Sequence, residues 1–247
     1  RDGDGATALF EACRAGDLPV VVALVRGRAD PNIATQQGLL PLRAAMPTED
    51  GTALVAELLQ AKAEPEGREP DGTTAVWAAA KGGQDATLSY LLDARADPTT
   101  GPTPPLAAAA AAESRACVQA LALAGGHMHT AMQFAVTEAP RETPVRLLLE
   151  AKGDPRLVVQ EDGERRGLVD LLAATRAVRT VAGMMVVKLL LEAGAEVWSE
   201  PGIAAESAID WATTEGEVDI DQAVACLLRA SRSQPDMRKS RKLILME

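Results

Sequence analysis

Two histidines one residue apart, His127 and His129, are the only histidines in the chain and could begin a zinc site. A complete site needs further nitrogen, sulfur or carboxylate ligands at suitable spacing, and none can be assigned from the sequence. The cysteines, Cys13, Cys117 and Cys226, stand far apart and share no metal-binding spacing. We therefore interpret the histidines as a polar junction and the cysteines as small buried residues, and we predict no metal and no cofactor.

Carboxylates that recur along the chain are the next candidates, because paired carboxylates can perform acid–base chemistry. Asp30, Glu64, Asp97 and Asp154 each stand directly before a proline. Their regular recurrence favours a role in turns, where a carboxylate accepts hydrogen bonds from nearby backbone amides. The sequence contains neither a glycine-rich phosphate loop nor a nucleophile elbow. We therefore predict that the chain is not an enzyme.

A third charged group is the insertion from Glu161 to Arg166, which reads Glu-Asp-Gly-Glu-Arg-Arg. We interpret it as a solvated loop between structural units, with contact to a partner as the alternative.

The segments that must position these residues repeat along the chain. A sequence motif such as Thr7-Ala8-Leu9 stands at the start of each unit, and a motif such as Ala29-Asp30-Pro31 stands at its end. Two sequence motifs that recur with the same period indicate a repeat protein. The opening marks are Thr7, Leu40, Thr74, Pro104, Thr130, Gly167 and Ser207, at intervals of 33, 34, 30, 26, 37 and 40 residues.

Each unit carries signals for two helices. A Thr before an apolar run can cap a helix, and Pro41 and Pro105 suit a first helical turn, where no backbone donor is lost. The first helix is rich in Ala, whereas the second carries an aliphatic stripe that neighbouring units must cover. Glycines such as Gly16 and Gly194 are expected to end helices with a positive φ angle.

These residues resemble the ankyrin repeat family, whose unit is a turn and two antiparallel helices of about 33 residues. The segments 4–9, Asp-Gly-Ala-Thr-Ala-Leu, and 71–76, Asp-Gly-Thr-Thr-Ala-Val, match the family's turn and helix start. The resemblance implies an all-α, ankyrin-like solenoid of about seven helix-turn-helix repeats, with short extended or hairpin tips and irregular later repeats. We expect one repeat domain over residues 1–230, followed by a basic and apolar tail over 231–247. Its units are expected near 4–34, 35–67, 69–99, 100–127, 128–156, 157–198 and 202–230.

The resemblance also implies a function. In ankyrin-like stacks the tips and the exposed face of the first helix form a concave binding surface, which predicts a non-enzymatic scaffold or adaptor for a partner protein. The alternatives are a structural or linker subunit of a large multiprotein assembly, organellar or membrane-associated, and a regulatory or inhibitory module of an enzyme. The family's signature histidine is replaced here by Phe10, Arg43, Trp77, Ala107, Gln133, Asp170 and Asp210.

Candidate partner-binding residues follow from these positions. Trp is enriched among interface hot spots, and a buried junction between repeats is the alternative role for Trp77. The candidates in the repeats are Gln36, Gln37, Arg43, Asp71, Trp77 and Trp198.

Charge narrows the choice of partner. Residues 229–247 carry a net charge of +4, and because the whole chain carries −10, residues 1–228 carry −14. An acidic body disfavours nucleic acid, whose phosphates need Lys and Arg, so we expect a basic or neutral protein surface. The tail is interpreted as a solvated segment, or alternatively as a docking peptide for a partner or an anionic membrane surface. The basic candidates in the tail are Arg238, Lys239, Arg241 and Lys242.

The composition also bears on the cellular setting. No apolar run in the sequence is long enough to span a bilayer, so we expect a water-soluble protein. Buried, unpaired cysteines suit a reducing intracellular compartment, and the cytoplasm is our expectation. Since the chain begins with Arg1, an organelle reached after removal of a leader is the alternative.

Overall fold

The computed structural model describes residues 3–138, 140–161, 164–174 and 180–195. It divides into two compact units, residues 1–131 and 132–247, whose boundary lies inside helix α9. The predictions for Trp198, Asp210, Cys226, the unit near 202–230 and the tail lie outside the described residues.

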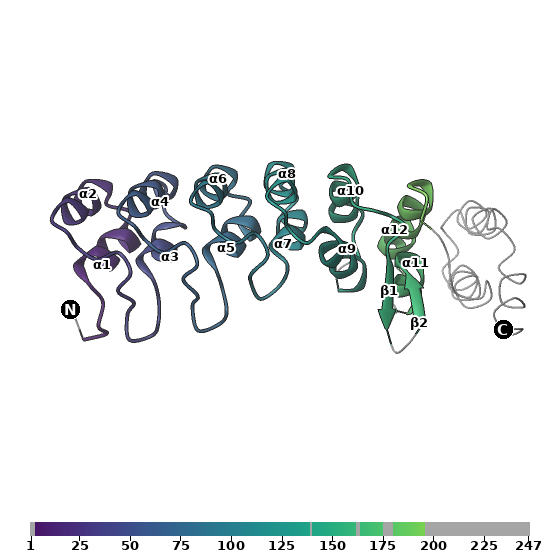
Figure 1. Cartoon of the computed structure of the whole chain (residues 1–247), viewed down its shortest axis with the longest axis horizontal. Coiled ribbons are helices and arrows are strands. Elements are labelled where there is room, and N and C mark those ends of the chain that lie inside the picture. The colour runs from purple at the N-terminus through teal and green to yellow at the C-terminus, as the bar shows by residue number, and fades with distance from the viewer. Residues whose placement is uncertain (1–2, 139, 162–163, 175–179, 196–247) are drawn as a thin grey trace, which may run out of the picture. The chain divides into compact units, whose positions relative to one another are not determined.

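The described part of the first unit is a stack of helix pairs. The helices of each pair contact each other, and each second helix contacts the second helix of the next pair. First helices form one layer and second helices another, with the connecting loops extending beyond the first-helix layer (Figure 1). The pairs are α1 (Ala8–Ala15) with α2 (Leu18–Arg26), α3 (Pro41–Ala45) with α4 (Gly51–Gln60), α5 (Ala75–Lys81) with α6 (Asp85–Asp93), and α7 (Pro105–Ala111) with α8 (Arg115–Leu123).

The predicted start and stop signals of these helices are confirmed. Thr7 Oγ1 accepts a hydrogen bond from the Phe10 amide at 3.1 Å, and so caps α1. Pro41 is the first residue of α3, where its missing N–H costs no helical hydrogen bond. Gly16 ends α1 with a φ of 77°, a conformation that glycine adopts without steric cost.

The core of the first unit lies between the stacked pairs. Leu58, Leu91 and Leu121 of successive second helices are fully buried, and so are Ala79 and Ala109 of the first helices. Burying one Leu side chain contributes roughly 1.5–3 kcal/mol, while the small Ala faces let the helices approach closely. The stack is therefore held by contacts between neighbouring repeats.

Most of the second helices within the described residues end in a left-handed residue that is not glycine. Arg28, Lys62 and Arg95 have φ angles of 65°, 66° and 64° at equivalent positions. An L-residue pays a steric cost in this conformation, and a basic side chain partly offsets it by its attraction to the helix C-terminus.

The described part of the second unit contains a hairpin between its helices. β1 and β2 pair antiparallel, with Val158 opposite Gly167 and Glu161 opposite Glu164. Helix α12 contacts both α10 and α11, and α11 also contacts β2. The elements are the end of α9 (Met128–Thr137), then α10 (Glu142–Glu150), β1 (Val158–Glu161), β2 (Glu164–Gly167), α11 (Leu168–Ala174) and α12 (Val181–Glu192).

The hairpin corrects one sequence-based prediction. The insertion 161–166 was expected to be a solvated loop, but Glu161, Glu164, Arg165 and Arg166 belong to paired strands. Charged residues are depleted in strands, so composition favours a loop there. The dipeptide Asp162-Gly163 in the sequence is a strong hairpin signal, and cross-strand pairing prevails over the composition.

Across the residues that the structure describes, no helix combines the length and the apolar character that a membrane crossing requires.

Candidate protein-binding surface

The loops between the early repeats end in tight turns of one design. In residues 35–39 and again in 69–73, the amide of the first residue donates to the carbonyl of the fifth at 3.0 Å. The amide of the fourth residue also donates to the carbonyl of the first, at 3.0 Å and 2.9 Å respectively. That fourth residue is Gly38 or Gly72, with φ angles of 78° and 80°. Each turn is therefore a closed tip with a defined backbone.

Neighbouring tips touch one another. The Gln36 amide donates to the Asp4 carbonyl at 3.0 Å, and a Cβ added to Gly5 would lie 2.8 Å from Gln36 Cγ. A Cβ added to Gly38 would likewise lie 2.8 Å from Cγ of Pro70 in the next tip. A side chain at Gly5 or Gly38 would have to displace its neighbour, so the first three tips lie in direct contact.

Three predicted contact residues lie exposed on these tips. Gln36 and Gln37 are exposed on one tip, and Asp71 is exposed on the next. Asp71 Oδ1 accepts a hydrogen bond from the Thr73 amide at 2.9 Å. Hydrogen bonds from Thr73 lower the pKa of Asp71 the most, and the positive charge of Arg43 lowers it further. One tip therefore presents two neutral amides, and the next presents a carboxylate whose ionised form is stabilised.

Arg43 lies on α3 and reaches the following tip. Its Nε is 3.6 Å from Oε2 of Glu69, and the two side chains are only 25% and 10% exposed. Its Nη1 is 3.7 Å from the Met46 sulfur, while its buried Nε lacks a hydrogen-bond partner. Arg43 therefore holds the tip 69–73 by charge, with part of its side chain accessible.

Trp77 occupies the equivalent position one repeat later and also reaches the following tip. Its Nε1 donates to Thr103 Oγ1 at 2.8 Å, and a Cβ at Gly101 would lie 2.7 Å from its Cδ1. Lys81 Nζ lies 4.7 Å from the centroid of the half-buried indole. These contacts join two repeats, and a partner-binding role for Trp77 stays a prediction. At the same repeat position, Phe10 and Ala107 are buried.

Further polar residues that the sequence did not single out connect the loops. Asn32 Oδ1 accepts from the Glu64 amide at 2.7 Å, and Asn32 Nδ2 donates to the Lys62 carbonyl at 3.1 Å. Glu66 Oε1 accepts from the Asp97 amide at 2.6 Å. No local signal marks these residues or Glu69 and Thr103, because each needs a partner in the next repeat.

The recurring carboxylates have the predicted turn role at three of four places. Asp30 Oδ1 accepts from the amide of Asn32 at 2.9 Å, Asp97 Oδ1 from Thr99 at 2.8 Å, and Asp154 Oδ1 from Arg156 at 2.8 Å.

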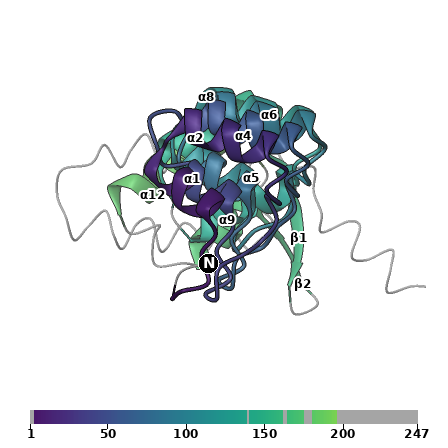
Figure 2. The same cartoon turned by 90° about the vertical axis from the view of Figure 1, so that its left-hand side faces the viewer.

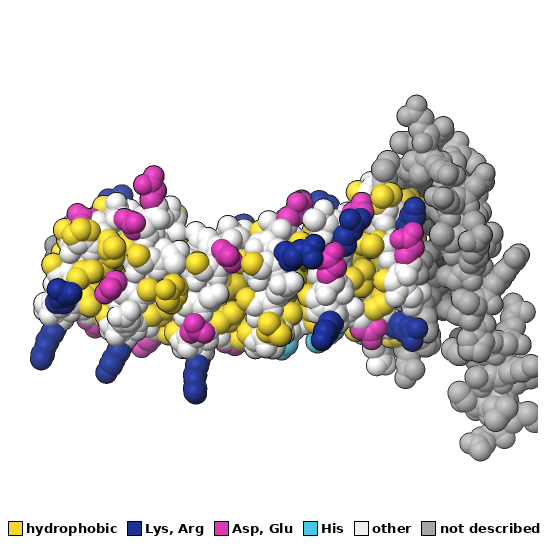
Figure 3. Space-filling view, turned by 90° about the horizontal axis from the view of Figure 1, so that it is seen from above, with side chains coloured by type: hydrophobic (Ala, Val, Ile, Leu, Met, Phe, Trp, Pro, Cys, Tyr) yellow, Lys and Arg dark blue, Asp and Glu magenta, His cyan; other side chains and the backbone are white. Residues whose placement is uncertain are grey.

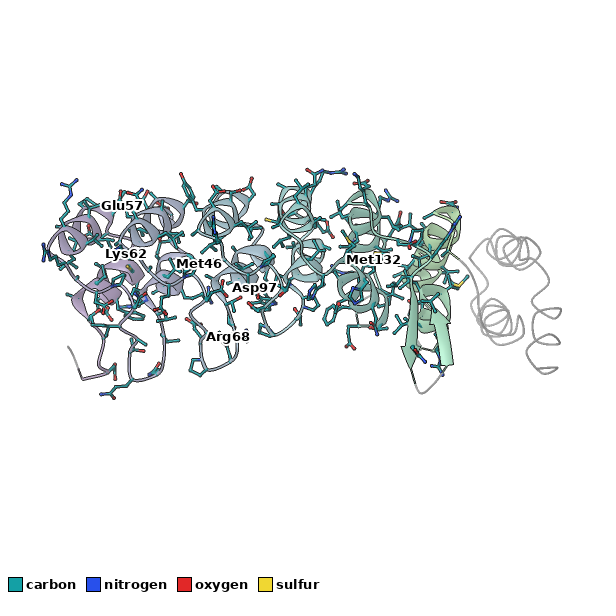
Figure 4. All side chains as sticks on the ribbon, viewed as in Figure 1. Met46, Glu57, Lys62, Arg68, Asp97 and Met132 are labelled. Carbon is teal, nitrogen blue, oxygen red and sulfur yellow. The ribbon has the colours of Figure 1, made fainter. Side chains whose placement is uncertain are left out.

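Asp97 also illustrates the electrostatics of the loops. Hydrogen bonds from Thr99 lower the pKa of Asp97 most, and the positive charges of His127 and Arg68 add to the effect. Figure 4 shows Arg68 and Asp97 in successive loops below the first-helix layer. The carboxylates here stabilise turns and neighbouring loops.

The two histidines lie near each other. The ring centroids of His127 and His129 are 6.2 Å apart, and the described residues contain no cluster of three or more His, Cys, Asp or Glu suited to a metal. Cys13 and Cys117 are free and buried, as predicted. Burial raises the pKa of Cys13 to about 12 and also raises that of Cys117.

Comparison with known proteins defines the fold. The sequence model of the ankyrin repeat matches residues 4–36, and no curated protein sequence matches the chain. The ankyrin repeat domain of Bcl-3, a member of the IkappaB protein family, aligns with a TM-score of 0.62 and 24% identity over 78% of this chain and 88% of that one. The human ASB11 ankyrin repeat domain aligns with a TM-score of 0.62 and 19% identity over 90% of this chain and 98% of that one.

The chain therefore has the ankyrin repeat fold, and its first repeat carries the family's sequence pattern. This fold is a general scaffold for protein–protein interaction, because stacked repeats offer an extended surface.

Proposed function

We propose that the chain is a non-enzymatic scaffold or adaptor that binds a partner protein on its tip surface. The tip surface consists of Gln36, Gln37 and Asp71, with Arg43 and Trp77 beside them. The observation that carries this proposal is the direct contact between neighbouring tips through Gly5 and Gly38. A surface whose geometry is set before binding loses little conformational entropy when a partner docks.

The chemistry of the tip surface suits a protein segment with hydrogen-bonding groups. Exposed Gln36 and Gln37 can donate to and accept from a partner's backbone, and the Asp71 carboxylate can pair with a cationic side chain. The net charge of −14 on residues 1–228 supports a basic or neutral partner. Binding by the basic tail 231–247 is a separate prediction that removal of the tail would test.

The experiment compares the intact chain with a variant that changes only exposed tip residues. Gln36→Ala/Gln37→Ala should lower the recovery of cross-linked partner proteins at least about 10-fold, since hot-spot residues contribute 2 kcal/mol or more. Recovery is measured by quantitative mass spectrometry, and circular dichroism verifies that the helical content is unchanged.

A matched control uses two exposed glutamines on second helices, Gln60 of α4 and Gln119 of α8. Gln60→Ala/Gln119→Ala makes the same chemical change away from the tips and should leave recovery unchanged. Equal recovery with both double variants would exclude the tip surface as the binding site.

A further inference from the structure

The second helices of the first three repeats end in the same turn, and each turn carries one basic residue. The backbone amides of Arg28, Lys62 and Arg95 donate to the carbonyl three residues earlier, at 2.9, 3.0 and 2.9 Å. The amide of the Ala that follows each base donates to the carbonyl five residues earlier, at 3.0, 2.9 and 3.0 Å. This pair of hydrogen bonds is the Schellman arrangement, which places the basic residue in the left-handed region.

The fourth repeat forms this turn with glycine. Gly125 has a φ of 91°, and the amide of Gly126 donates to the Leu121 carbonyl at 2.8 Å. The turn therefore requires no side chain, and glycine forms it without the steric cost that an L-residue has there. The attraction of a basic side chain to the helix C-terminus offsets only part of that cost. Unfavourable backbone conformations cluster at functional sites, so three successive bases at this position indicate a role beyond the turn.

Contacts between repeats hold the three turns in one row. Asn32, four residues after Arg28, donates through Nδ2 to the Lys62 carbonyl at 3.1 Å. Glu66, four residues after Lys62, accepts at Oε1 from the Asp97 amide at 2.6 Å. Helices α2, α4 and α6 pack side by side, as Figure 2 shows in a view along the first unit. The backbone therefore presents the three bases in a fixed order, one from each repeat.

The three basic side chains are exposed. Within the part of the chain that the structure describes, none of them forms an ion pair or a side-chain hydrogen bond. The carboxylates of Asp30 and Asp97, which follow two of the bases, accept from backbone amides instead, while Glu64 is exposed. Figure 3 shows a row of Lys or Arg side chains that extend from one long edge of the first unit, farther out than the acidic side chains near them.

The spacing of this basic row indicates the shape of its ligand. Packed helices lie about 8–10 Å apart, and neighbouring repeats therefore place their bases about that far apart. A polyproline II segment has three residues per turn and rises about 3.1 Å per residue. Every third side chain therefore lies on the same side of the segment, about 9 Å further along. Carboxylates at every third residue of such a segment match the bases of the row one to one.

The overall charge favours a short acidic segment over a long polyanion. Residues 1–228 carry a net charge of −14. A nucleic acid or an anionic membrane extends beyond the basic row, and the rest of this acidic surface repels it. A peptide segment with a few carboxylates contacts the row alone.

We propose that Arg28, Lys62 and Arg95 bind an acidic segment of a partner protein, in the polyproline II conformation and with Asp or Glu at every third residue. An exposed ion pair contributes about two- to fivefold in affinity, so binding is reversible and depends on all three bases. This proposal does not rest on the tip surface, which belongs to the loops beyond the first-helix layer.

Fluorescence anisotropy with a labelled peptide of four Glu-Pro-Pro triplets tests the proposal at low ionic strength. The full chain should bind this peptide with a dissociation constant below about 500 μM. Addition of about 300 mM salt should weaken binding at least about fivefold, because salt screens exposed charges. Two further peptides should bind at least about fivefold more weakly. One has the same composition with its Glu residues adjacent, and the other has Lys in place of Glu.

The variant Arg28→Gln/Lys62→Gln/Arg95→Gln removes the three charges and should weaken binding of the Glu-Pro-Pro peptide roughly 10- to 100-fold. Circular dichroism verifies that the helical content is unchanged.

A matched control makes the same change in net charge outside the row. Arg14, Lys81 and Arg115 are exposed bases of the first unit on α1, α5 and the start of α8. Arg14→Gln/Lys81→Gln/Arg115→Gln should change the affinity for the peptide less than about threefold, since these bases do not lie in the row.

A change to glycine separates binding from a structural role of the bases. Arg28→Gly/Lys62→Gly/Arg95→Gly removes the charges together with the left-handed strain, so this variant should keep its fold and still lose binding of the peptide. It also serves if the Gln variant fails to fold. A folded Gly variant that binds the peptide as the wild type does would overturn the proposal.

Absence of peptide binding by the wild type at about 500 μM protein would also overturn the proposal, as would equal affinity for the peptide with adjacent Glu residues. Tighter binding of a single-stranded oligonucleotide or of phosphatidylserine vesicles than of the Glu-Pro-Pro peptide would overturn it too, because the row would then serve a different class of ligand.

Discussion

At the scale of single residues, the signature position of the second and third repeats makes a contact with the following repeat. Arg43 contacts Glu69 by charge, and Trp77 contacts Thr103 by a hydrogen bond. Both residues reach from a first helix to the following tip, although one is cationic and the other aromatic. Different chemistry at one repeat position thus performs the same structural task.

Substitution of Trp77 and Thr103 tests whether their hydrogen bond stabilises the contact between the two repeats. Trp77→Phe removes the indole donor, and Thr103→Val removes its acceptor. Each change should lower the free energy of unfolding by about 1 kcal/mol, the net contribution of one hydrogen bond. The double variant should lose less than the sum of the two, because both changes remove the same bond. Urea unfolding monitored by circular dichroism measures the free energy of unfolding of the wild type, the two single variants and the double variant. Strictly additive losses of stability would contradict the coupling between Trp77 and Thr103.

At the scale of elements, the left-handed ends of the second helices are the least expected feature. Helices commonly end in glycine at a left-handed position, yet Arg28, Lys62, Arg95 and Lys152 adopt positive φ angles here. The left-handed conformation destabilises an L-residue by about 1–2 kcal/mol. The attraction between a basic side chain and the helix dipole stabilises the folded state by about 0.3–1 kcal/mol. The balance indicates that these helix ends are not optimised for stability.

A pair of substitutions at Arg95 separates the two effects. Arg95→Gly removes both the charge and the steric strain of the left-handed conformation. Arg95→Ala removes the charge and keeps the strain. We expect the Gly variant to be more stable than the Ala variant by about 1 kcal/mol, since glycine avoids the left-handed penalty but has a more flexible unfolded chain. Thermal and urea unfolding of both variants check this order. An Ala variant as stable as the Gly variant would mean that the helix end relaxes out of the left-handed region.

At the scale of the whole molecule, stability in a repeat stack comes from neighbours, so it is uneven along the chain. The first helix pair of the first unit contacts the second pair, and no described element packs on its other face. The fourth pair follows the third, and the chain continues beyond it into α9. In the chain of residues 1–247, the first repeat should therefore open more often than the fourth.

Cysteine labelling measures this difference. Thiols react as thiolates, and burial raises the pKa of Cys13 to about 12 and that of Cys117 above its usual value. Both thiols should therefore react near pH 8 mainly after local opening. In dilute protein we expect Cys13 to react at least about tenfold faster than Cys117, which corresponds to about 1.4 kcal/mol in opening free energy.

Mass spectrometry of the labelled peptides separates the two sites from Cys226, and unfolded protein provides the reference rates. Equal protection of Cys13 and Cys117 in the folded state would mean that the first unit opens as one cooperative body.

Much of the fold could be predicted from the sequence because the signals for its helices and turns are local. Thr7 caps a helix, Pro41 begins one and Gly16 ends one, each through contacts within a few residues of itself. The turn role of Asp30 is local in the same sense, since its carboxylate bonds to an amide two residues away. Signals of this kind recur along the early units, so the sequence alone determined the ankyrin repeat fold and the acidic character of residues 1–228.

Only the tertiary structure decided which residues of different repeats meet. The Trp77–Thr103 bond joins residues 26 positions apart, and the Gln84–Met46 bond joins residues 38 apart. The hairpin formed by β1 and β2 differs from the predicted loop, although its turn signal Asp162-Gly163 is local and stands in the sequence. The physical reason is that periodicity identifies faces within a unit, whereas stacking determines what lies against each face.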